Sequence, residues 1–175
     1  MKITVSGPPG AGTSTVSSFL AERFELEHVS SGDVFRRMAE ERDVSLAEFG
    51  EIAEGDPSID EEIDERQREI AAGTDDIVME GRLSGWMVED PDLAIWLDAP
   101  LDVRAERVAD REQESVETAR ERIAERAASE ATRYHQIHGI DIGDLSIYDL
   151  VIDTSTWGED AVEDLVALAV ERLDG

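Results

Sequence analysis

A glycine-rich loop near the start of the chain constrains the fold more than any other feature. The apolar run Ile3–Val5 leads into the sequence GPPGAGTST, and apolar residues then recur at helical spacing from Val16 to Phe24. A strand, a loop with glycines at positions 7 and 12 and a helix, in this order, are typical of a phosphate-binding loop. An ordinary glycine turn is the alternative, and the order of the three elements disfavours it.

This loop, called the glycine loop below, predicts an anion site. Glycines let the backbone curl so that several N–H groups point inward, and the positive end of the next helix adds to their attraction for a phosphate. Ser14 stands where the motif places a hydroxyl that binds Mg²⁺. Thr13 replaces the usual lysine, so we expect arginines and the metal to supply the missing charge. The predicted site comprises Gly7, Pro8, Pro9, Gly10, Ala11, Gly12, Thr13, Ser14 and Thr15.

Strands and helices alternate along the rest of the chain. Apolar patterns predict further strands at 28–30, 77–79, 94–97 and 150–152, and helices at 32–42, 46–54, 59–72, 101–108, 116–137 and 162–173. This alternation predicts an α/β fold with a parallel sheet and helices on both faces, as a single domain over residues 1–175. The stretches 32–73 and 104–133 are surplus to the sheet, and we expect them at its carboxyl edge, where such folds bind ligands.

The composition of the chain argues against several kinds of partner and structure. The chain has 43 Asp and Glu against 16 Lys and Arg, a net charge of -27, so long nucleic acid is not an expected partner. Hydrophobic residues make up 41% in periodic runs, which argues against disorder and favours a protein adapted to concentrated salt. The absence of cysteine excludes disulfides, and no apolar run approaches the roughly 20 residues that span a bilayer. We expect a cytoplasmic protein without a membrane partner.

Two segments that follow predicted strands carry arginines. In SSGDVFRR, the serines at 30 and 31 suit a helix N-cap and Asp33 suits the first turn, while Arg36 can bind a phosphate through its planar guanidinium. In MEGRLSGW, Gly81 lets the chain turn and places Arg82 at the predicted ligand edge. Glu80 either orients water around Mg²⁺ or positions Arg82, and both interpretations stay open.

Arginines also recur at helical spacing in two stripes. The first consists of Arg104, Arg107 and Arg111, and the second, along the long helix, of Arg122, Arg126 and Arg133 with Glu130 among them. If the long helix folds over the glycine loop, we expect convergence on a polyphosphate of Arg82, Arg107, Arg126 and Arg133. The alternative is solvated ion pairing with the abundant carboxylates, which we expect for Arg120, Arg122 and Arg172.

The motifs together resemble a known family. GPPGAGTST, SSGDVFR, VMEGRLSGW, IWLDAPLDVRAERV and ERAASEATRYHQIHGIDIGDLSIYDLVIDT, in this order, resemble the cytidylate kinases of the archaeal type over essentially the whole chain. The acidity suggests a haloarchaeal member. The resemblance implies a three-layer P-loop NTPase-type fold with a core (1–31, 74–103 and 148–175), a helical NMP-binding insert (32–73) and a lid (104–147). It implies transfer of the γ-phosphoryl group of ATP to CMP or dCMP with Mg²⁺, and we expect a monomer.

The same resemblance implies roles for single residues. The glycine loop binds ATP, with Ser14 on the metal, and the expected catalytic residues are Arg82, Arg126 and Arg133. The implied substrate-binding set is Ser31, Arg36, Asp60, Arg82, Arg126, Glu130 and Arg133. Asp60, Asp64 and Glu130 are candidates for accepting a hydrogen bond from the cytosine amino group. The chain departs from the bacterial pattern at Thr13, Leu83 and Glu130.

Two alternatives remain at this point. An adenylate or uridylate kinase with the same fold is the nearest one. The other, from a different class, is a non-catalytic nucleotide-binding protein that lost its activity with the lysine. A second phosphate site and a lid argue against the latter, since a simple binder needs neither.

Overall fold

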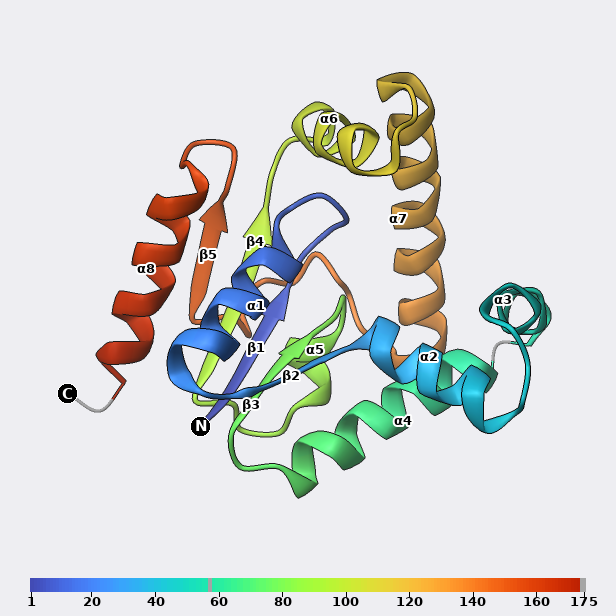
Figure 1. Ribbon diagram of the computed structural model, residues 1–175, viewed down its shortest axis with the longest axis horizontal. Helices are drawn as coiled ribbons and strands as arrows, with labels where there is room; N and C mark the ends of the chain where they lie inside the picture. The colour runs from blue at the N-terminus through green and yellow to red at the C-terminus, as the bar shows by residue number, and fades with distance from the viewer. Residues whose placement is uncertain (57, 174–175) are drawn as a thin grey trace.

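Five parallel strands form one sheet at the centre of the molecule (Figure 1). The computed structural model describes residues 1–56 and 58–173. The strands are β1 (Lys2–Ser6), β2 (Glu27–Ser30), β3 (Ile77–Glu80), β4 (Leu93–Asp98) and β5 (Leu150–Asp153). Their order in the sheet is β2-β3-β1-β4-β5, and every neighbouring pair is parallel. The predicted parallel α/β fold is confirmed.

The helices follow the predicted periodicity, with ends shifted by a few residues. They are α1 (Thr13–Phe24), α2 (Ser31–Glu41), α3 (Leu46–Gly55), α4 (Ser58–Gly73), α5 (Ser84–Met87), α6 (Leu101–Glu112), α7 (Val116–His138) and α8 (Glu159–Glu171). The short helix α5 was not expected, because four residues are too few to show a helical period. Among the described residues, no helix has both the length and the apolar character needed to cross a membrane.

Alternating side chains on the strands build a separate core on each face of the sheet. On β3, Val78 packs into one cluster with residues of α1 and α8, whereas Ile77 and Met79 pack into another with residues of α2, α3 and α4. This follows from the two-residue period of a strand, which sends neighbouring side chains to opposite faces. Because both faces are covered, the sheet is the middle layer of a three-layer fold.

The register of the sheet places the ends of β1 and β3 side by side. Val5 lies opposite Glu80, and the backbone N–H of Gly81 donates to the Val5 carbonyl. The glycine loop, which follows β1, and the Gly81–Arg82 turn, which follows β3, therefore leave the sheet at the same edge. Helices α2 and α6 leave from the neighbouring strands β2 and β4 at this edge (Figure 1).

Helices α6 and α7 form a hairpin with a small core of its own. Ala105, Val108 and Ala109 of α6 pack against Ala119 and Ile123 of α7, and this cluster is separate from the two clusters on the sheet. Figure 1 shows α7 standing beyond the carboxyl edge of the sheet, with α6 at one of its ends and α2 and α4 near the other. The hairpin therefore bridges the two sides of that edge.

Loss of the largest side chain in the hairpin core tests this arrangement. The substitution Ile123→Ala removes a side chain that is 1% exposed, and we expect it to lower the free energy of unfolding by about 2–5 kcal/mol. Val116→Ala on the same helix is the control, because Val116 is 39% exposed and its loss costs less than about 0.5 kcal/mol. Urea unfolding at constant KCl measures both, and equal effects would contradict a separate hairpin core.

Candidate active site

The glycine loop has the backbone geometry of an anion cradle. Gly10 and Gly12 have positive φ angles of 84° and 97°, and Gly12 caps α1 without any side-chain hydrogen bond. The first N–H groups of α1 are therefore left to bind an external acceptor. A Cβ on Gly10 would lie 2.7 Å from the carbonyl oxygen of Arg104, so both the backbone angle and the packing against α6 require glycine here.

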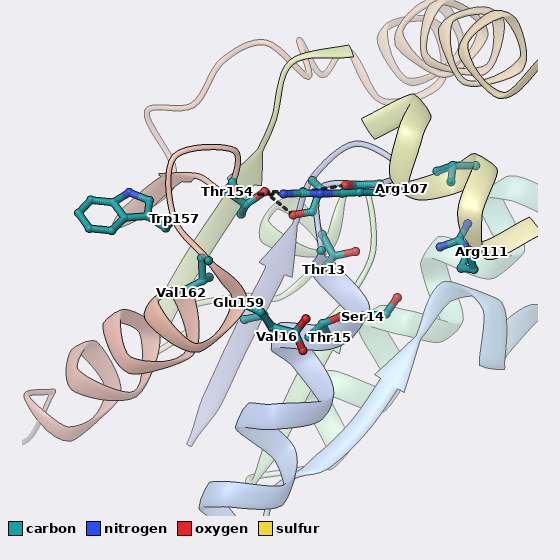
Figure 2. A pocket seen from close by; sticks show the side chains of 15 residues that line it. Thr13, Ser14, Thr15, Val16, Arg107, Arg111, Thr154, Trp157, Glu159 and Val162 are labelled. Carbon is teal, nitrogen blue, oxygen red and sulfur yellow. Dashed lines mark hydrogen bonds between the residues drawn. The ribbon is translucent and has the colours of Figure 1, made fainter. Parts of the chain in front are cut away.

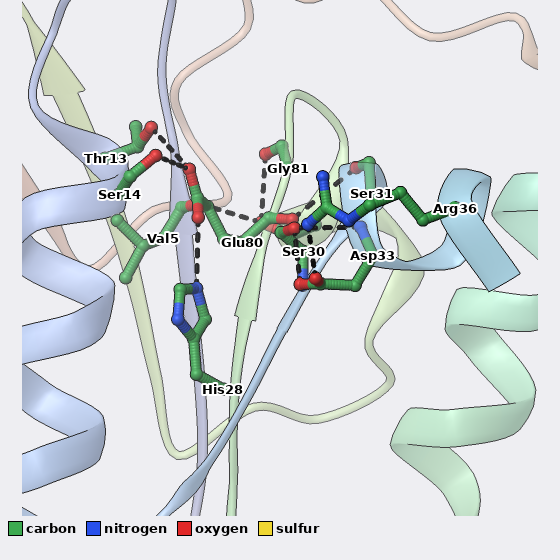
Figure 3. Close-up of polar contacts among 11 residues, drawn as sticks. Val5, Thr13, Ser14, His28, Ser30, Ser31, Asp33, Arg36, Glu80 and Gly81 are labelled. Atoms are coloured by element: carbon green, nitrogen blue, oxygen red, sulfur yellow. Dashed lines mark hydrogen bonds and ion pairs between the residues drawn. The ribbon is translucent and has the colours of Figure 1, made fainter. Parts of the chain in front are cut away.

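The carboxylate of Glu80 holds the two hydroxyls at the start of α1. Glu80 Oε1 accepts hydrogen bonds from Thr13 Oγ1 at 3.0 Å and from Ser14 Oγ at 2.6 Å, and Oε2 lies 3.0 Å from His28 Nε2 (Figure 3). Burial raises the pKa of Glu80, but hydrogen bonds from His28, Ser14 and Thr13 outweigh it and leave the pKa below 4.5. Of its two open roles, Glu80 is placed for the one near Ser14, since Arg82 pairs elsewhere.

Arginines of α6 bind the outside of the glycine loop. Arg104 donates through Nη1 to the Pro9 carbonyl at 3.3 Å, and Arg107 donates to the Gly10 carbonyl at 3.1 Å. Arg107 also donates to the side-chain and backbone oxygens of Thr154, each at 2.9 Å (Figure 2). The structure places Arg107 in one cavity and Arg82, Arg126 and Arg133 in another, so the four arginines do not gather in one cavity as expected, although Arg111 of α6 lines both cavities.

A first cavity of about 440 Å³ opens on this side of the loop (Figure 2). Its walls come from the glycine loop, α6, the segment after β5 and the start of α8. The Thr154 hydroxyl donates to the Ala11 carbonyl at 2.9 Å and so ties the segment after β5 to the loop. In Figure 2 the Trp157 ring points away from the loop, which leaves the cavity open.

A second cavity of about 690 Å³ lies on the other side of the loop, between α2, α4 and α7. At its centre, Glu130 is 3% exposed and accepts from Arg82 Nε at 2.6 Å and from Arg126 Nε at 2.7 Å. Burial raises the pKa of Tyr134 to about 12, and the charge of Glu130 adds to this rise. The expected site residues that line this cavity are Ser31, Arg36, Asp60, Arg82, Arg126, Glu130 and Arg133.

The acidic side chains of α4 pair with α7 across this cavity. Arg133 Nε lies 3.0 Å from Asp60 Oδ2, a close ion pair whose angle does not make a hydrogen bond. His138 Nε2 lies 2.7 Å from Asp64 Oδ2. Burial raises the pKa of Asp64, and the hydrogen bond with His138 opposes that rise. The two pairs hold the end of α7 over α4, so both carboxylates are already engaged.

The N-terminus of α2 is stabilised as the sequence predicts. The Ser30 side chain accepts from the Asp33 N–H at 3.1 Å, and the Asp33 carboxylate accepts from the Ser30 N–H at 2.9 Å (Figure 3). This reciprocal capping box confirms the structural role of Asp33. Arg36 lies 2.5 Å from the Asp33 carboxylate. Its side chain is 54% exposed, so it is placed at the cavity rim.

Sequence reasoning missed several residues that the fold brings to the site. His28 lies behind Glu80, Thr154 ties the segment after β5 to the glycine loop, and Gln67 of α4 lines the second cavity. The position of Thr154 directly after a strand was the one available signal. Gln67 lay within an acidic amphipathic helix and had none.

Comparison with known proteins shows the family of this chain. The profile of the cytidylate kinase-like family matches residues 2–156. The chain belongs to the cytidylate kinase-like family. Cytidylate kinase of Halobacterium salinarum is 53% identical over 172 residues, covering 98% of this chain and 90% of that protein. The cytidylate kinases of Methanococcoides burtonii and Pyrococcus horikoshii are 52% and 54% identical, each over 98% of this chain and over 97% and 89% of their own.

Solved structures support the fold of this cytidylate kinase-like chain. Shikimate kinase from Bacteroides thetaiotaomicron matches with a TM-score of 0.61 at 14% identity, covering 98% of both chains. An uncharacterised protein from Eubacterium ventriosum matches with a TM-score of 0.73 at 18% identity, covering 98% of this chain and 99% of its own. At these identities the likeness establishes the three-layer α/β fold alone.

The contact between Gly10 and α6 provides a test of the cradle. We expect Gly10→Ala to lower the affinity of the glycine loop for inorganic tripolyphosphate by roughly tenfold or more, because an L residue in left-handed backbone costs about 1–2 kcal/mol. The control is Gly50→Ala in α3, where a Cβ has no atom within 4 Å and the affinity should not change. Titration calorimetry measures both, and an unchanged affinity for Gly10→Ala would exclude this cradle.

The capping box of α2 predicts a pH dependence. Burial raises the pKa of Asp33, but hydrogen bonds from Ser30 and Arg36 outweigh it and lower the pKa from 3.8 to about 2. Its stabilisation is therefore complete above pH 3.8 and is lost as the pH falls through about 2. We expect Asp33→Asn to be about 1 kcal/mol less stable than the parent at pH 6. In urea unfolding at several pH values, this gap should close between pH 4 and 2; a constant gap would contradict the capping role.

Proposed function

We propose that this protein transfers the γ-phosphoryl group of ATP to CMP and dCMP, forming ADP and CDP or dCDP. The observation that carries the proposal is that the two cavities meet at the glycine loop. Gly10, Thr13 and Ser14 line both cavities. A donor nucleotide in the first cavity and an acceptor in the second would thus face each other across the loop, as direct transfer requires.

The donor is assigned to the first cavity. Its triphosphate binds the free N–H groups of the glycine loop, and its nucleoside lies between α6 and the segment after β5. Ser14 Oγ and Glu80 Oε1 lie 2.6 Å apart, and they would hold Mg²⁺ either directly or through water, because this ion prefers oxygen ligands. When bound, Mg²⁺ neutralises charge on the phosphates.

The acceptor is assigned to the second cavity, with its phosphate on Arg82 and Arg36. Arg126 and Arg133, which belong to α7, stabilise the negative charge of the phosphoryl group that is transferred. The core, the NMP-binding insert at 32–73 and the lid at 104–147 then act as three parts. In this view the lid is tied to the insert through the Asp60–Arg133 and Asp64–His138 pairs, and closing it excludes water that would hydrolyse ATP.

The glycine loop has positive charge nearby even though Thr13 stands in the place of the lysine. Arg104 and Arg107 of α6 donate to carbonyl oxygens of the loop, and Arg111 lines both cavities. We infer that these guanidinium groups, with the metal, take the place of the lysine ammonium. Transfer needs no dedicated base, since the acceptor is already an anionic phosphate oxygen. The expectation of a cytoplasmic monomer stays a prediction.

The proposal predicts both a substrate preference and a sensitive residue. In a coupled ADP-release assay at molar KCl, we expect CMP and dCMP to be preferred over UMP and AMP. We expect Arg82→Gln to lower kcat/KM by roughly 10²–10³-fold, because it removes charge stabilisation at the acceptor phosphate. Arg120→Gln is the matched control, since Arg120 pairs with Asp102 on the exposed surface and should keep full activity.

Two outcomes would overturn the proposal. A preference for AMP or UMP would assign the protein to another nucleotide, as an adenylate or uridylate kinase. If the protein binds ATP but forms no ADP with any of the monophosphates, it is a non-catalytic nucleotide-binding protein.

A further inference from the structure

The three carboxylates expected to recognise cytosine are already paired in the second cavity. Asp60 is paired with Arg133, Asp64 with His138, and Glu130 with both Arg82 and Arg126. A base that used one of them as an acceptor would have to compete with a cation for it. The group that accepts from a base is therefore to be sought among the uncharged polar side chains of the cavity.

Gln67 is such a side chain. It projects from α4 into the second cavity, yet it is only 3% exposed. Its Nε2 donates to Ser31 Oγ at 3.2 Å. Over residues 1–56 and 58–173, none of the recorded hydrogen bonds ends on Gln67 Oε1, which lies 3.3 Å from the place that a Cβ of Gly81 would take. Because Gln67 Oε1 is not one of the fully buried atoms without a partner, it reaches the open space of the cavity and is available to accept a hydrogen bond from a ligand there.

Ser31 determines which way the amide of Gln67 points. A serine hydroxyl has one hydrogen, and that of Ser31 is directed to the Glu80 carbonyl at 3.5 Å. In this arrangement Ser31 Oγ accepts from Gln67 Nε2 at 3.2 Å, which turns the oxygen of the amide toward the cavity. This serine follows β2 directly and is the first residue of α2.

The cavity around Gln67 suits a base more than a phosphate. Phe35 of α2 and Ile63 of α4 line it beside Gln67, whereas the guanidinium groups of the cavity belong to Arg82, to Arg36 at its rim, to Arg111 of α6 and to Arg126 and Arg133 of α7. Leu83, which is 4% exposed, adds a further apolar wall. With the phosphate held at the guanidinium groups, a flat apolar ring occupies the remaining space and its polar edge faces an amide.

We propose that Gln67 determines the choice of pyrimidine by accepting a hydrogen bond from the 4-amino group of cytosine. This proposal rests on the proposed function, in which CMP occupies the second cavity. Cytosine carries a donor at position 4, and uracil carries an acceptor there. Because Ser31 holds the amide so that its oxygen faces the base, uracil places two acceptors against each other. A site built in this way rejects the wrong base through an unpaired buried polar group.

The test removes the two partners of the contact in turn, the acceptor on the protein and the donor on the ligand. Gln67→Leu removes it from the protein, and the monophosphate of 2-pyrimidinone ribonucleoside, a CMP analogue without the 4-amino group, removes the donor from the ligand. Turnover is measured with CMP, UMP and this analogue at molar KCl, and binding of the same three nucleotides is measured by calorimetry without ATP. Gln67→Met is a second variant that fills the same volume with a flexible side chain.

We expect the parent to prefer CMP over the analogue, and Gln67→Leu and Gln67→Met to lose roughly tenfold to a hundredfold in kcat/KM and affinity for CMP. The same variants should bind the analogue about as well as the parent does, so that CMP and the analogue become equivalent. Arg68→Gln, at the next position of α4, is the control, because Arg68 pairs with Glu65 at the surface and should change neither value.

The outcomes separate this proposal from the proposed function. If the parent phosphorylates CMP but the Gln67 variants weaken all three nucleotides equally, or leave the preference for CMP intact, Gln67 has a structural role and only this proposal fails. If the parent phosphorylates none of the three, the proposed function fails, and the calorimetric preference between CMP and the analogue still decides the role of Gln67. A parent that binds CMP and its analogue equally overturns the role directly.

Discussion

The parallel pairing of β1 with β3 is the constraint on which the rest of the site depends. It places Val5 opposite Glu80, so the glycine loop and the Gly81–Arg82 turn start from neighbouring points of one edge. From there the Glu80 carboxylate reaches the hydroxyls of Thr13 and Ser14. The two cavities share the loop because it lies between the elements that leave this edge. A slip of one residue in this pairing would separate all of these groups.

The charge distribution gives the site its second property. A chain with a net charge of -27 has few cations, yet several of its arginines face the two cavities or the glycine loop. Glu130, which is almost fully buried, accepts from Arg82 and Arg126 and holds both guanidinium groups at the second cavity, although the side chain of Arg126 is 60% exposed. A buried carboxylate is tolerated only with such partners. The acidic surface thus surrounds an edge that can attract phosphates over a short range.

Much of this could be predicted from local pattern, and the errors have a common cause. Helical spacing showed that Arg107 and Arg126 belong to stripes, but it could not show that Arg107 contacts the glycine loop and Thr154 while Arg126 contacts Glu130. Periodicity describes the face of a helix and not the element packed against it. For the same reason periodicity did not indicate a role for Gln67, because that role depends on its contact with Ser31, 36 positions away along the chain. The short helix α5 was missed because it is shorter than two turns.

The sequence by itself determined the order of strands and helices, the glycine loop and the capping box of α2, because these depend on neighbours within a few residues. Only the tertiary structure decided which groups meet. The Glu80 contact with Ser14 spans 66 positions, and the Arg82–Glu130 pair spans 48. Such contacts follow from sheet register and helix packing, which gather distant segments through the burial of apolar surface as a whole. A short motif does not contain information about packing over the whole chain, so only the folded structure shows which residues are partners at the site.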